Sequence, residues 1–364
     1  MRIVVAMSGG VDSSVAAALL VEQGHDVIGL SMQLYDVSAE TDGERSFGSC
    51  CTIDDLHDAR RVATAIRIPH YILNFERQFQ EQVVSNFVGE YAAGRTPLPC
   101  AHCNSDLKFA TLLDRAQGFG AEAVATGHYA RVERTGVGGS YQLRRGVDPS
   151  KDQSYFLFAL TQEQLARAVF PVGDRPKDAV REYAHQRQLP VASKPDSQEI
   201  CFIPDHDYAG FVTRHSPEAA ASGGAIVDES GHVLGHHAGI HRFTVGQRKG
   251  LGLASSPIGA PMYVLSLKPD NHEVVVGPKA SLERTKLTAS GVNWVEGAPA
   301  APRRACVQIR HRHQPAAATL RATGDGRAEV VFDAPQIAVT PGQAAVFYDG
   351  DVVLGGGWID NELT

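Results

Sequence analysis

Residues 2–14 read RIVVAMSGGVDSS, and this stretch decides the expected fold of the first half of the chain. An apolar run typical of a buried strand leads straight into Gly9-Gly10, and a helical pattern begins near Ser13. Glycines let the backbone approach an anion, while hydroxyls and the free N–H groups of a helix start donate hydrogen bonds to it. The stretch therefore predicts a pyrophosphate-binding loop, whereas a glycine turn without a ligand is the alternative.

Asp12 is the unusual member of this loop, because a carboxylate beside phosphates is unfavourable. A Mg²⁺ ion between the two removes the repulsion, so we expect Asp12 to bind Mg²⁺. The Lys-Ser or Lys-Thr ending of a Walker loop is missing, which argues against chemistry at the γ-phosphate.

Strand-like and helical segments alternate through the first half of the chain, and residues 156–188 read as further helices. This alternation predicts an α/β domain, a doubly wound parallel sheet, over residues 1–204. Short apolar runs among glycines and histidines predict a small β-rich central domain over residues 205–282. Period-two runs separated by turns predict a C-terminal β-barrel over residues 283–364.

The 364 residues include 43% hydrophobic and 21% charged residues, which is typical of globular proteins. The net charge of −7 does not attract nucleic acid, so an RNA site needs a local basic surface. No secretion signal opens the chain, and no apolar run approaches the length of about 18 residues that spans a membrane. We expect a cytoplasmic protein without a membrane partner.

Two of the six cysteines, Cys103 and Cys201, lie in loops rich in Pro and polar residues. A helix is expected to start near Cys103 and to stabilise its thiolate. Two separated reactive cysteines suit sulfur relay, in which one carries a persulfide. Alternatively, Cys100, Cys103 and Cys201 could hold three corners of an iron–sulfur cluster.

The other cysteines carry weaker signals. Cys306 lies in an alternating strand and is expected to be a buried small side chain, whereas Cys50 and Cys51 are undecided. An apolar, buried environment makes a thiol inert.

Two groups of basic residues are candidates for RNA contact, although a solvated surface is the alternative. In the second group, the alternation of Arg310, His311 and Arg312 predicts both arginines on one face of a strand. The groups are Arg242, Gln247, Arg248 and Lys249, and Arg303, Arg304, Arg310 and Arg312.

Six motifs in order, SGGVDSS, GRTPLPCAHCN, ATGHYAR, KDQSYFLF, DSQEICFIP and FTVGQRKGLG, closely resemble those of the bacterial tRNA-specific 2-thiouridylases. These enzymes belong to the PP-loop, or N-type, ATP pyrophosphatases, and the similarity spans nearly the whole chain. The resemblance implies adenylation of the 2-oxygen of the wobble uridine, followed by replacement of that oxygen with sulfur. AMP and pyrophosphate are released.

The resemblance also implies site residues. Cys103 is implied as the nucleophile and Cys201 as the persulfide carrier, and the pair can end as a disulfide. The resemblance implies as the sulfur source a persulfide donor such as a cysteine desulfurase or a sulfur-relay protein. ATP binding is implied for Ala6, Met7, Ser8, Gly9, Gly10, Val11, Asp12, Ser13, Met32 and Gly127.

Contacts with tRNA are implied for residues of both halves. Many family members have Asn-Pro-Asp where this chain has Leu98-Pro99-Cys100, so a carboxylate for proton transfer is missing and Cys100 supplies the third thiol of the cluster alternative. The tRNA-contacting residues are Leu98, Pro99, Cys100, His128, Lys151, Asp152, Gln153 and Gln343, with Arg310 from the basic surface.

Two further functions share the phosphate loop. A PP-loop ligase that transfers nitrogen needs no cysteine pair, so full activity of a Cys103→Ser variant would favour it. An RNA-binding protein that senses ATP without chemistry would release no pyrophosphate.

Overall fold

The structure, a computed structural model, describes residues 1–34, 53–136, 139–196, 200–203, 205–218, 223–253 and 261–360. Cys50 and Cys51 therefore lie outside the described residues. Within the described segments, no helix has the length and apolar character needed to cross a bilayer. The chain forms two compact units, the first being Met1–Val84, Pro99–His206 and Asp351–Leu354 and the second Ser85–Leu98, Asp207–Gly350 and Gly355–Thr364.

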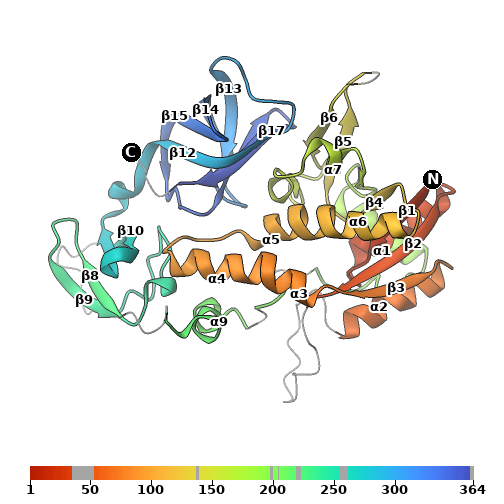
Figure 1. The fold of residues 1–364 in the computed structure, drawn as a ribbon, viewed down its shortest axis with the longest axis horizontal. Coiled ribbons are helices and arrows are strands. Elements are labelled where there is room, and N and C mark those ends of the chain that lie inside the picture. The colour runs from red at the N-terminus through yellow and green to blue at the C-terminus, as the bar shows by residue number, and fades with distance from the viewer. Residues whose placement is uncertain are drawn as a thin grey trace. The chain divides into compact units, whose positions relative to one another are not determined.

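The first unit is built on a five-stranded sheet of order β3-β2-β1-β4-β7 (Figure 1). All its pairings are parallel, as the alternation of strands and helices predicts. The central strand β1 is buried from its second residue onward, which explains its continuous apolar run. Its strands are β1 (Arg2–Ala6), β2 (Asp26–Gln33), β3 (His70–Asn74), β4 (Ala123–Ala125) and β7 (Ala168–Val169).

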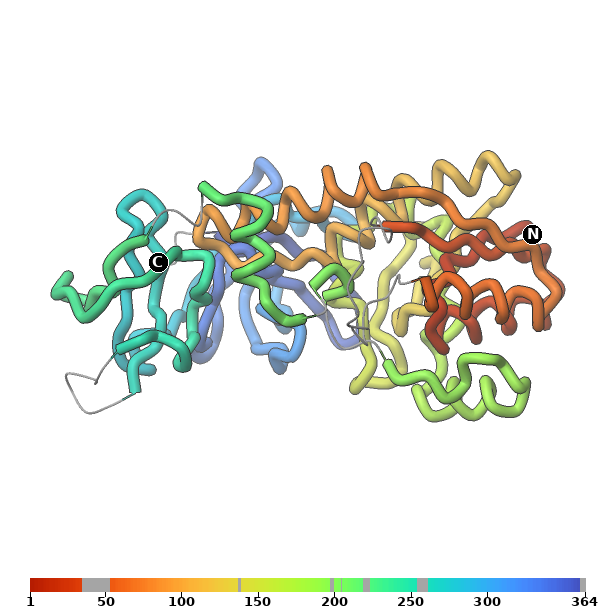
Figure 2. The backbone as a smooth tube through the Cα atoms, turned by 90° about the horizontal axis from the view of Figure 1, so that it is seen from below, coloured from red at the N-terminus to blue at the C-terminus, as the bar shows by residue number. Residues whose placement is uncertain are grey.

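Helices cover this sheet, and α8 packs along α1, as can be followed in Figure 2. A β-hairpin of β5 and β6 extends the unit. The helical elements are α1 (Val11–Glu22), α2 (Ile53–Ala65), α3 (Glu76–Phe79), α5 (Pro99–His102), α6 (Leu112–Gly118), α7 (Gln162–Leu165) and α8 (Lys177–Gln186), the π-helical η2 (Gln80–Val84) and η3 (Cys103–Thr111), and the 3₁₀ turn η4 (Ser154–Phe156). The hairpin strands are β5 (Ala130–Arg134) and β6 (Tyr141–Arg145).

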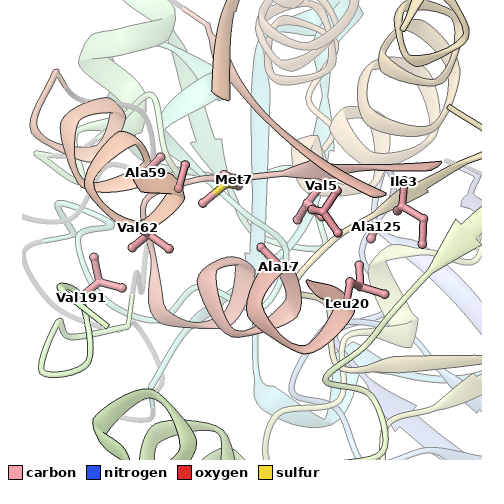
Figure 3. Close-up of a cluster of buried hydrophobic side chains, with 11 residues drawn as sticks. Ile3, Val5, Met7, Ala17, Leu20, Ala59, Val62, Ala125 and Val191 are labelled. Carbon is pink, nitrogen blue, oxygen red and sulfur yellow. The ribbon is translucent and has the colours of Figure 1, made fainter. Parts of the chain in front are cut away.

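The core under the phosphate loop joins β1 to two helices. Ile3 and Val5 of β1 and Met7 just after it occupy alternate positions, so they share one face and meet α1 and α2. The loop between β1 and α1 is therefore anchored at both ends by packed apolar side chains. Figure 3 labels Ile3, Val5, Met7, Ala17, Leu20, Ala59, Val62, Ala125 and Val191 of this cluster.

The helical prediction for residues 156–170 is wrong over most of its length. Only η4 and α7 are helical there, and Ala168–Val169 forms β7 beside β4. Thr161 and Gln164 form a capping box that starts α7 at Gln162. Tertiary pairing with β4 then overrides the helical pattern.

In its described residues the second unit contains a four-stranded sheet of order β10-β11-β8-β9 together with the helices α4 and α9. Its core holds apolar side chains such as Ile226, Phe243 and Val274. The elements are α4 (Ser85–Ala92), α9 (Tyr208–His215), β8 (Gly224–Val227), β9 (Val233–His237), β10 (Tyr263–Lys268), β11 (Glu273–Gly277), and the 3₁₀ turns η5 (Ile240–Arg242), η6 (Pro269–Asn271) and η7 (Lys279–Leu282).

The C-terminal strands follow the order β12-β15-β14-β13-β16-β17, and pairing of β12 with β17 closes them into a barrel. The predicted C-terminal barrel is confirmed. Its strands are β12 (Glu283–Trp294), β13 (Arg303–Gln308), β14 (Ala316–Gly324), β15 (Arg327–Ile337), β16 (Ala344–Asp349) and β17 (Val352–Ile359).

Two predictions in this barrel are wrong. Cys306 is exposed because its neighbour Val307 takes the buried side of β13, and successive residues of a strand face opposite ways. Since β13 ends at Gln308, Arg310 and Arg312 lie in the following turn and share no strand face.

The phosphate loop requires glycine at position 9 but has room for a Cβ at position 10. Gly9 has φ +74°, and a Cβ there would lie 2.2 Å from the Asp55 carbonyl oxygen, whereas a Cβ on Gly10 would meet nothing closer than Ser8 Oγ at 3.5 Å. We predict that Gly9→Ala lowers the free energy of unfolding by about 2 kcal/mol. Gly10→Ala is the matched control and should change it little. Urea unfolding followed by circular dichroism measures both, and equal losses would contradict the prediction.

Candidate functional site

The phosphate loop is shaped by its own serines. Ser14 Oγ donates to the Gly10 carbonyl at 2.7 Å, and the Ser8 N–H donates to Ser13 Oγ at 3.2 Å. Gly10 is extended and α1 begins at Val11. Since the first N–H groups of a helix have no partner within it, they remain as donors for an anion.

Gly127 follows β4 and touches the start of α1. A Cβ at Gly127 would lie 2.5 Å from the Ser13 nitrogen and 2.6 Å from the Asp12 carbonyl carbon, so only glycine fits. Met7 follows β1, and Met32 lies near the end of β2. The structure thus brings the residues expected to bind ATP to the carboxyl edge of a parallel sheet, where such folds bind ligands.

Asp12 is paired inside the protein. Lys177 Nζ donates to both carboxylate oxygens, Oδ1 at 2.7 Å and Oδ2 at 2.9 Å, and the Tyr129 hydroxyl donates to Oδ1 at 2.8 Å. The Lys177 side chain is only 7% exposed. Burial, and then the charge of Asp12, raise the pKa of Tyr129 far above its usual value, which keeps its hydroxyl a donor. Lys177 belongs to no motif in the sequence. It reaches Asp12 because α8 packs on α1, and that contact cannot be read from the local sequence.

Lys194 holds the loop from the other side. Its Nζ donates to the Gly9 carbonyl at 3.1 Å, to Asp55 Oδ1 at 2.6 Å and to Asp58 Oδ2 at 2.7 Å. Burial lowers the pKa of Lys194. The hydrogen bonds from its ammonium to these two carboxylates raise the pKa by more than burial lowers it, so the net shift is upward. Lys194 lies just before the Cys201 motif, and its place beside two aspartates of α2 follows only from folding.

Asp196 gathers three cations. Its Oδ2 accepts from Lys151 Nζ at 2.8 Å, and its Oδ1 lies 2.8 Å from Lys177 Nζ and 2.5 Å from Arg181 Nη2. Partial burial raises the pKa of this carboxyl, but the hydrogen bonds from Lys151 and Lys177 outweigh burial and lower it to about 2. Asp196 is therefore an anion at neutral pH.

Asp152 and Gln153 face the protein. The Asp152 side chain is 6% exposed and accepts from Arg145 Nη1 at 2.7 Å. Gln153 pairs with the backbone of Tyr129, because its N–H donates to the Tyr129 carbonyl at 2.9 Å and its Oε1 accepts from the Tyr129 N–H at 3.0 Å. Of the three residues expected to contact tRNA here, Lys151 has the most exposed charge, at 38%.

His128 precedes Tyr129, and its Nδ1 lies 2.7 Å from Thr126 Oγ1. Burial lowers the pKa of His128 well below its usual value, and the positive charge of Lys108 lowers it further. The imidazole is therefore neutral at physiological pH and can exchange a hydrogen bond without carrying charge.

The expectation of a helix start at Cys103 is wrong by one turn. The helix begins at Pro99, where a missing N–H costs nothing, so the exposed Cys100 takes the first turn and the buried Cys103 the second. Asn104 is also buried, donating to the Phe156 carbonyl at 3.2 Å and accepting from Lys108 Nζ at 3.0 Å. The sequence does not predict a role for Asn104, and its position directly after Cys103 is the one signal that could have indicated it.

Cys201 lies in a turn and is half-buried, as its loop sequence predicts. Its neighbour Phe202 packs edge-on against Phe79 of α3 at 5.4 Å, and α3 packs against η3, which begins with Cys103. The two cysteines therefore lie on neighbouring segments of the first unit. Among the described residues, no three His, Cys, Asp or Glu side chains are grouped to hold a metal ion. An iron–sulfur cluster on Cys100, Cys103 and Cys201 does not fit this arrangement.

Three predicted tRNA contacts belong to the second unit. Gln343 Nε2 donates to the Thr96 carbonyl at 3.1 Å and to the Pro97 carbonyl at 3.2 Å, so it holds the backbone just before the buried Leu98. Arg310 is exposed in its turn and donates to the Ile337 carbonyl at 3.2 Å.

A parallel sheet, a glycine-serine phosphate loop at its carboxyl edge and a closed C-terminal barrel define a multidomain α/β protein of the nucleotide-binding HUP class. Family profiles match residues 1–205 as a tRNA methyl transferase HUP domain, 209–278 as a tRNA methyl transferase PRC-barrel domain and 284–359 as an aminomethyltransferase β-barrel domain. These matches agree with the predicted fold class.

The full-length relatives are named for thiolation. The chain is 54% identical to the tRNA-specific 2-thiouridylase MnmA of Solibacter usitatus, over 98% of this chain and 99% of the relative. It is 53% identical to that of Geotalea uraniireducens, over 100% of this chain and 96% of the relative. The chain belongs to the tRNA-specific 2-thiouridylase MnmA family. This membership argues against the nitrogen-transferring ligase and the RNA-binding protein without chemistry.

His128 should stay neutral at pH 6.5, where an ordinary histidine is half protonated. We predict that Lys108→Met raises the pKa of His128 toward its usual value, because removing a positive charge favours the imidazolium. Lys108→Arg keeps the charge and should leave the pKa low. NMR titration of the ring of His128 measures all three proteins, and an ordinary midpoint in the wild type would contradict the assignment.

Proposed function

We propose that this protein is an ATP-dependent 2-sulfurtransferase that acts on the wobble uridine of tRNA. The observation that carries the proposal is the close packing of Gly127 against Asp12 and Ser13, which brings the end of β4 against the phosphate loop at the start of α1. Family membership supplies the reaction class, since the relatives are named tRNA-specific 2-thiouridylases. The proposed division of labour is adenylation and thiolation in residues 1–204, a central domain in 205–282 and tRNA contact by the barrel in 283–364.

In the first step, the uridine O2 attacks the α-phosphorus of ATP, the bond to pyrophosphate breaks and the N3 proton of the base leaves. The N–H groups at the start of α1 and the loop serines stabilise the charge on pyrophosphate. Asp12 would hold Mg²⁺, which neutralises phosphate charge when bound. The residues fit this role, because the Asp12 carboxylate is 31% exposed and Mg²⁺ is usually held by one or two carboxylates together with substrate phosphates.

In the second step, the terminal sulfur of a Cys201 persulfide attacks C2 of the uridine and AMP leaves with the oxygen. The Cys103 thiolate then attacks the inner sulfur of Cys201. This attack breaks the S–S bond, leaves one sulfur on C2 and joins the two cysteines as a disulfide, while N3 regains its proton. A thiol reductant reopens the disulfide, and a persulfide donor protein recharges Cys201.

The target base must leave its stack to reach these groups, which costs least in a single-stranded loop. His128, as a neutral imidazole beside the phosphate loop, can hydrogen-bond the flipped uracil. Lys151 and Arg310 present exposed charge for RNA phosphates. Gln343 holds the segment that carries Leu98, so its contribution to RNA binding includes placing that segment.

We predict that thiolation requires two cysteines and no iron. Protein purified without oxygen is incubated with tRNA, Mg-ATP and a persulfide donor, and thiolated nucleoside, AMP and iron content are measured. Iron-free wild type should make thiolated uridine, Cys103→Ser and Cys201→Ser should lose it, and Cys100→Ser should keep most of it. Activity that follows bound iron and fails in Cys100→Ser would establish the cluster and overturn the relay.

We also predict that Asp12→Ala abolishes AMP formation and leaves tRNA binding within about twofold of wild type, because the carboxylate acts on the nucleotide and not on RNA. Lost transition-state interactions of this kind lower rates on the order of a hundredfold or more. AMP release and filter binding of tRNA are measured on the same preparation. Asp178→Asn, an exposed carboxylate on α8, is the control. Loss of tRNA binding in Asp12→Ala would show that Asp12 is misassigned.

A further inference from the structure

A continuous run of ion pairs joins the phosphate loop to the segment expected to contact tRNA. Asp196 accepts from Lys151 at 2.8 Å and pairs with Lys177 at 2.8 Å, and Lys177 in turn donates to Asp12 at 2.7 Å. Arg181 fixes the Asp196 end of this run by also donating to the Lys194 carbonyl at 3.0 Å. All of these residues belong to the first unit.

A second connection runs in parallel through Tyr129. Its backbone pairs with Gln153, two residues after Lys151, and its hydroxyl donates to Asp12. Lys177 also lies above the Tyr129 ring, with Nζ 5.8 Å from the centroid. The same two ends are therefore joined by backbone pairing as well as by charge.

We propose that Asp196 is a positioning residue that couples RNA binding to nucleotide binding, by sharing one carboxylate between Lys151 and Lys177. The inference rests on the proposed function, since it takes tRNA at Lys151 and Mg-ATP at Asp12. It goes beyond that function by assigning a role to Asp196, Lys177 and Arg181, which lie outside the residues expected to bind ATP or tRNA.

The sign of the coupling follows from the competition among these charges. An RNA phosphate that engages Lys151 withdraws one cation from Asp196. Asp196 then attracts Lys177 more strongly, and the hold of Lys177 on Asp12 weakens. An Asp12 oxygen becomes available to the Mg²⁺ of Mg-ATP, so RNA binding tightens nucleotide binding. By linkage, Mg-ATP tightens RNA binding by the same factor.

Burial along the run suits this direction of transfer. The exposed fraction of the side chain falls from 38% at Lys151 to 25% at Asp196 and 7% at Lys177, and it is 31% at Asp12, the far end of the run. Exposed charges are reached by a macromolecular ligand, whereas buried pairs are screened little by salt or water. Phosphate binding at the exposed Lys151 thus changes the contacts of the buried Lys177 ammonium.

The test measures the Kd of a non-hydrolysable ATP analogue with Mg²⁺ by isothermal titration calorimetry. Each protein is titrated without RNA and with a saturating unmodified tRNA transcript that carries uridine at the wobble position. Wild type should bind the analogue at least about fivefold more tightly with RNA present. Asp196→Asn and Lys151→Met should bring this ratio close to one, whereas Asp178→Asn, the same charge change on an exposed residue of α8, should keep the wild-type ratio.

Either a wild-type ratio near one or an unchanged ratio in Asp196→Asn overturns the inference. If melting shows that Asp196→Asn is unfolded, Lys151→Met decides the question, because its side chain is partly exposed and its removal leaves Asp196 paired with Lys177 and Arg181. Thiolated nucleoside is assayed on the same wild-type preparation. Thiolation without coupling between RNA and nucleotide binding would contradict only this inference. Coupling without thiolation would contradict only the proposed chemistry.

Discussion

The buried ammonium of Lys177 facing Asp12 is the interaction on which the site depends. A carboxylate in the first turn of α1 suits the positive end of the helix but repels phosphates. Lys177 neutralises it within hydrogen-bond distance, and the Tyr129 hydroxyl orients it. Without a cation at this point, the loop would present a negative charge to its own ligand.

The packing of the first unit holds Lys177 and Asp12 in this arrangement. The alternate apolar residues of β1 fix the strand that leads into the loop, and α8 carries Lys177 to its place by packing along α1. On the outer side, Lys194 ties the Gly9 carbonyl to Asp55 and Asp58. The loop is thus clamped by two lysines from distant parts of the chain, and its glycines tolerate the resulting close contacts.

The two cysteines proposed to carry sulfur are positioned by a different set of contacts. The helix that begins at Pro99 buries Cys103 in its second turn and leaves Cys100 exposed, so two cysteines three residues apart have unlike environments. Phe202 anchors the Cys201 turn on Phe79, in a helix that packs against the Cys103 segment. Among the described residues these cysteines form no group of three metal ligands with Cys100, which is consistent with the proposed relay.

The sequence by itself determined the parallel sheet, the phosphate loop and the C-terminal barrel, because periodicity and glycine-serine loops are local signals. It failed where distant contacts override local pattern, as at β7, where pairing with β4 replaced a predicted helix, and at Cys306, where Val307 took the buried side. Only the tertiary structure decided the partners of Asp12 and Asp196. Lys177 carries no motif and lies far from Asp12 in the chain. Lys151 belongs to the KDQSYFLF motif, but nothing in that motif indicates that it pairs with Asp196, so only the folded chain brings these charges together.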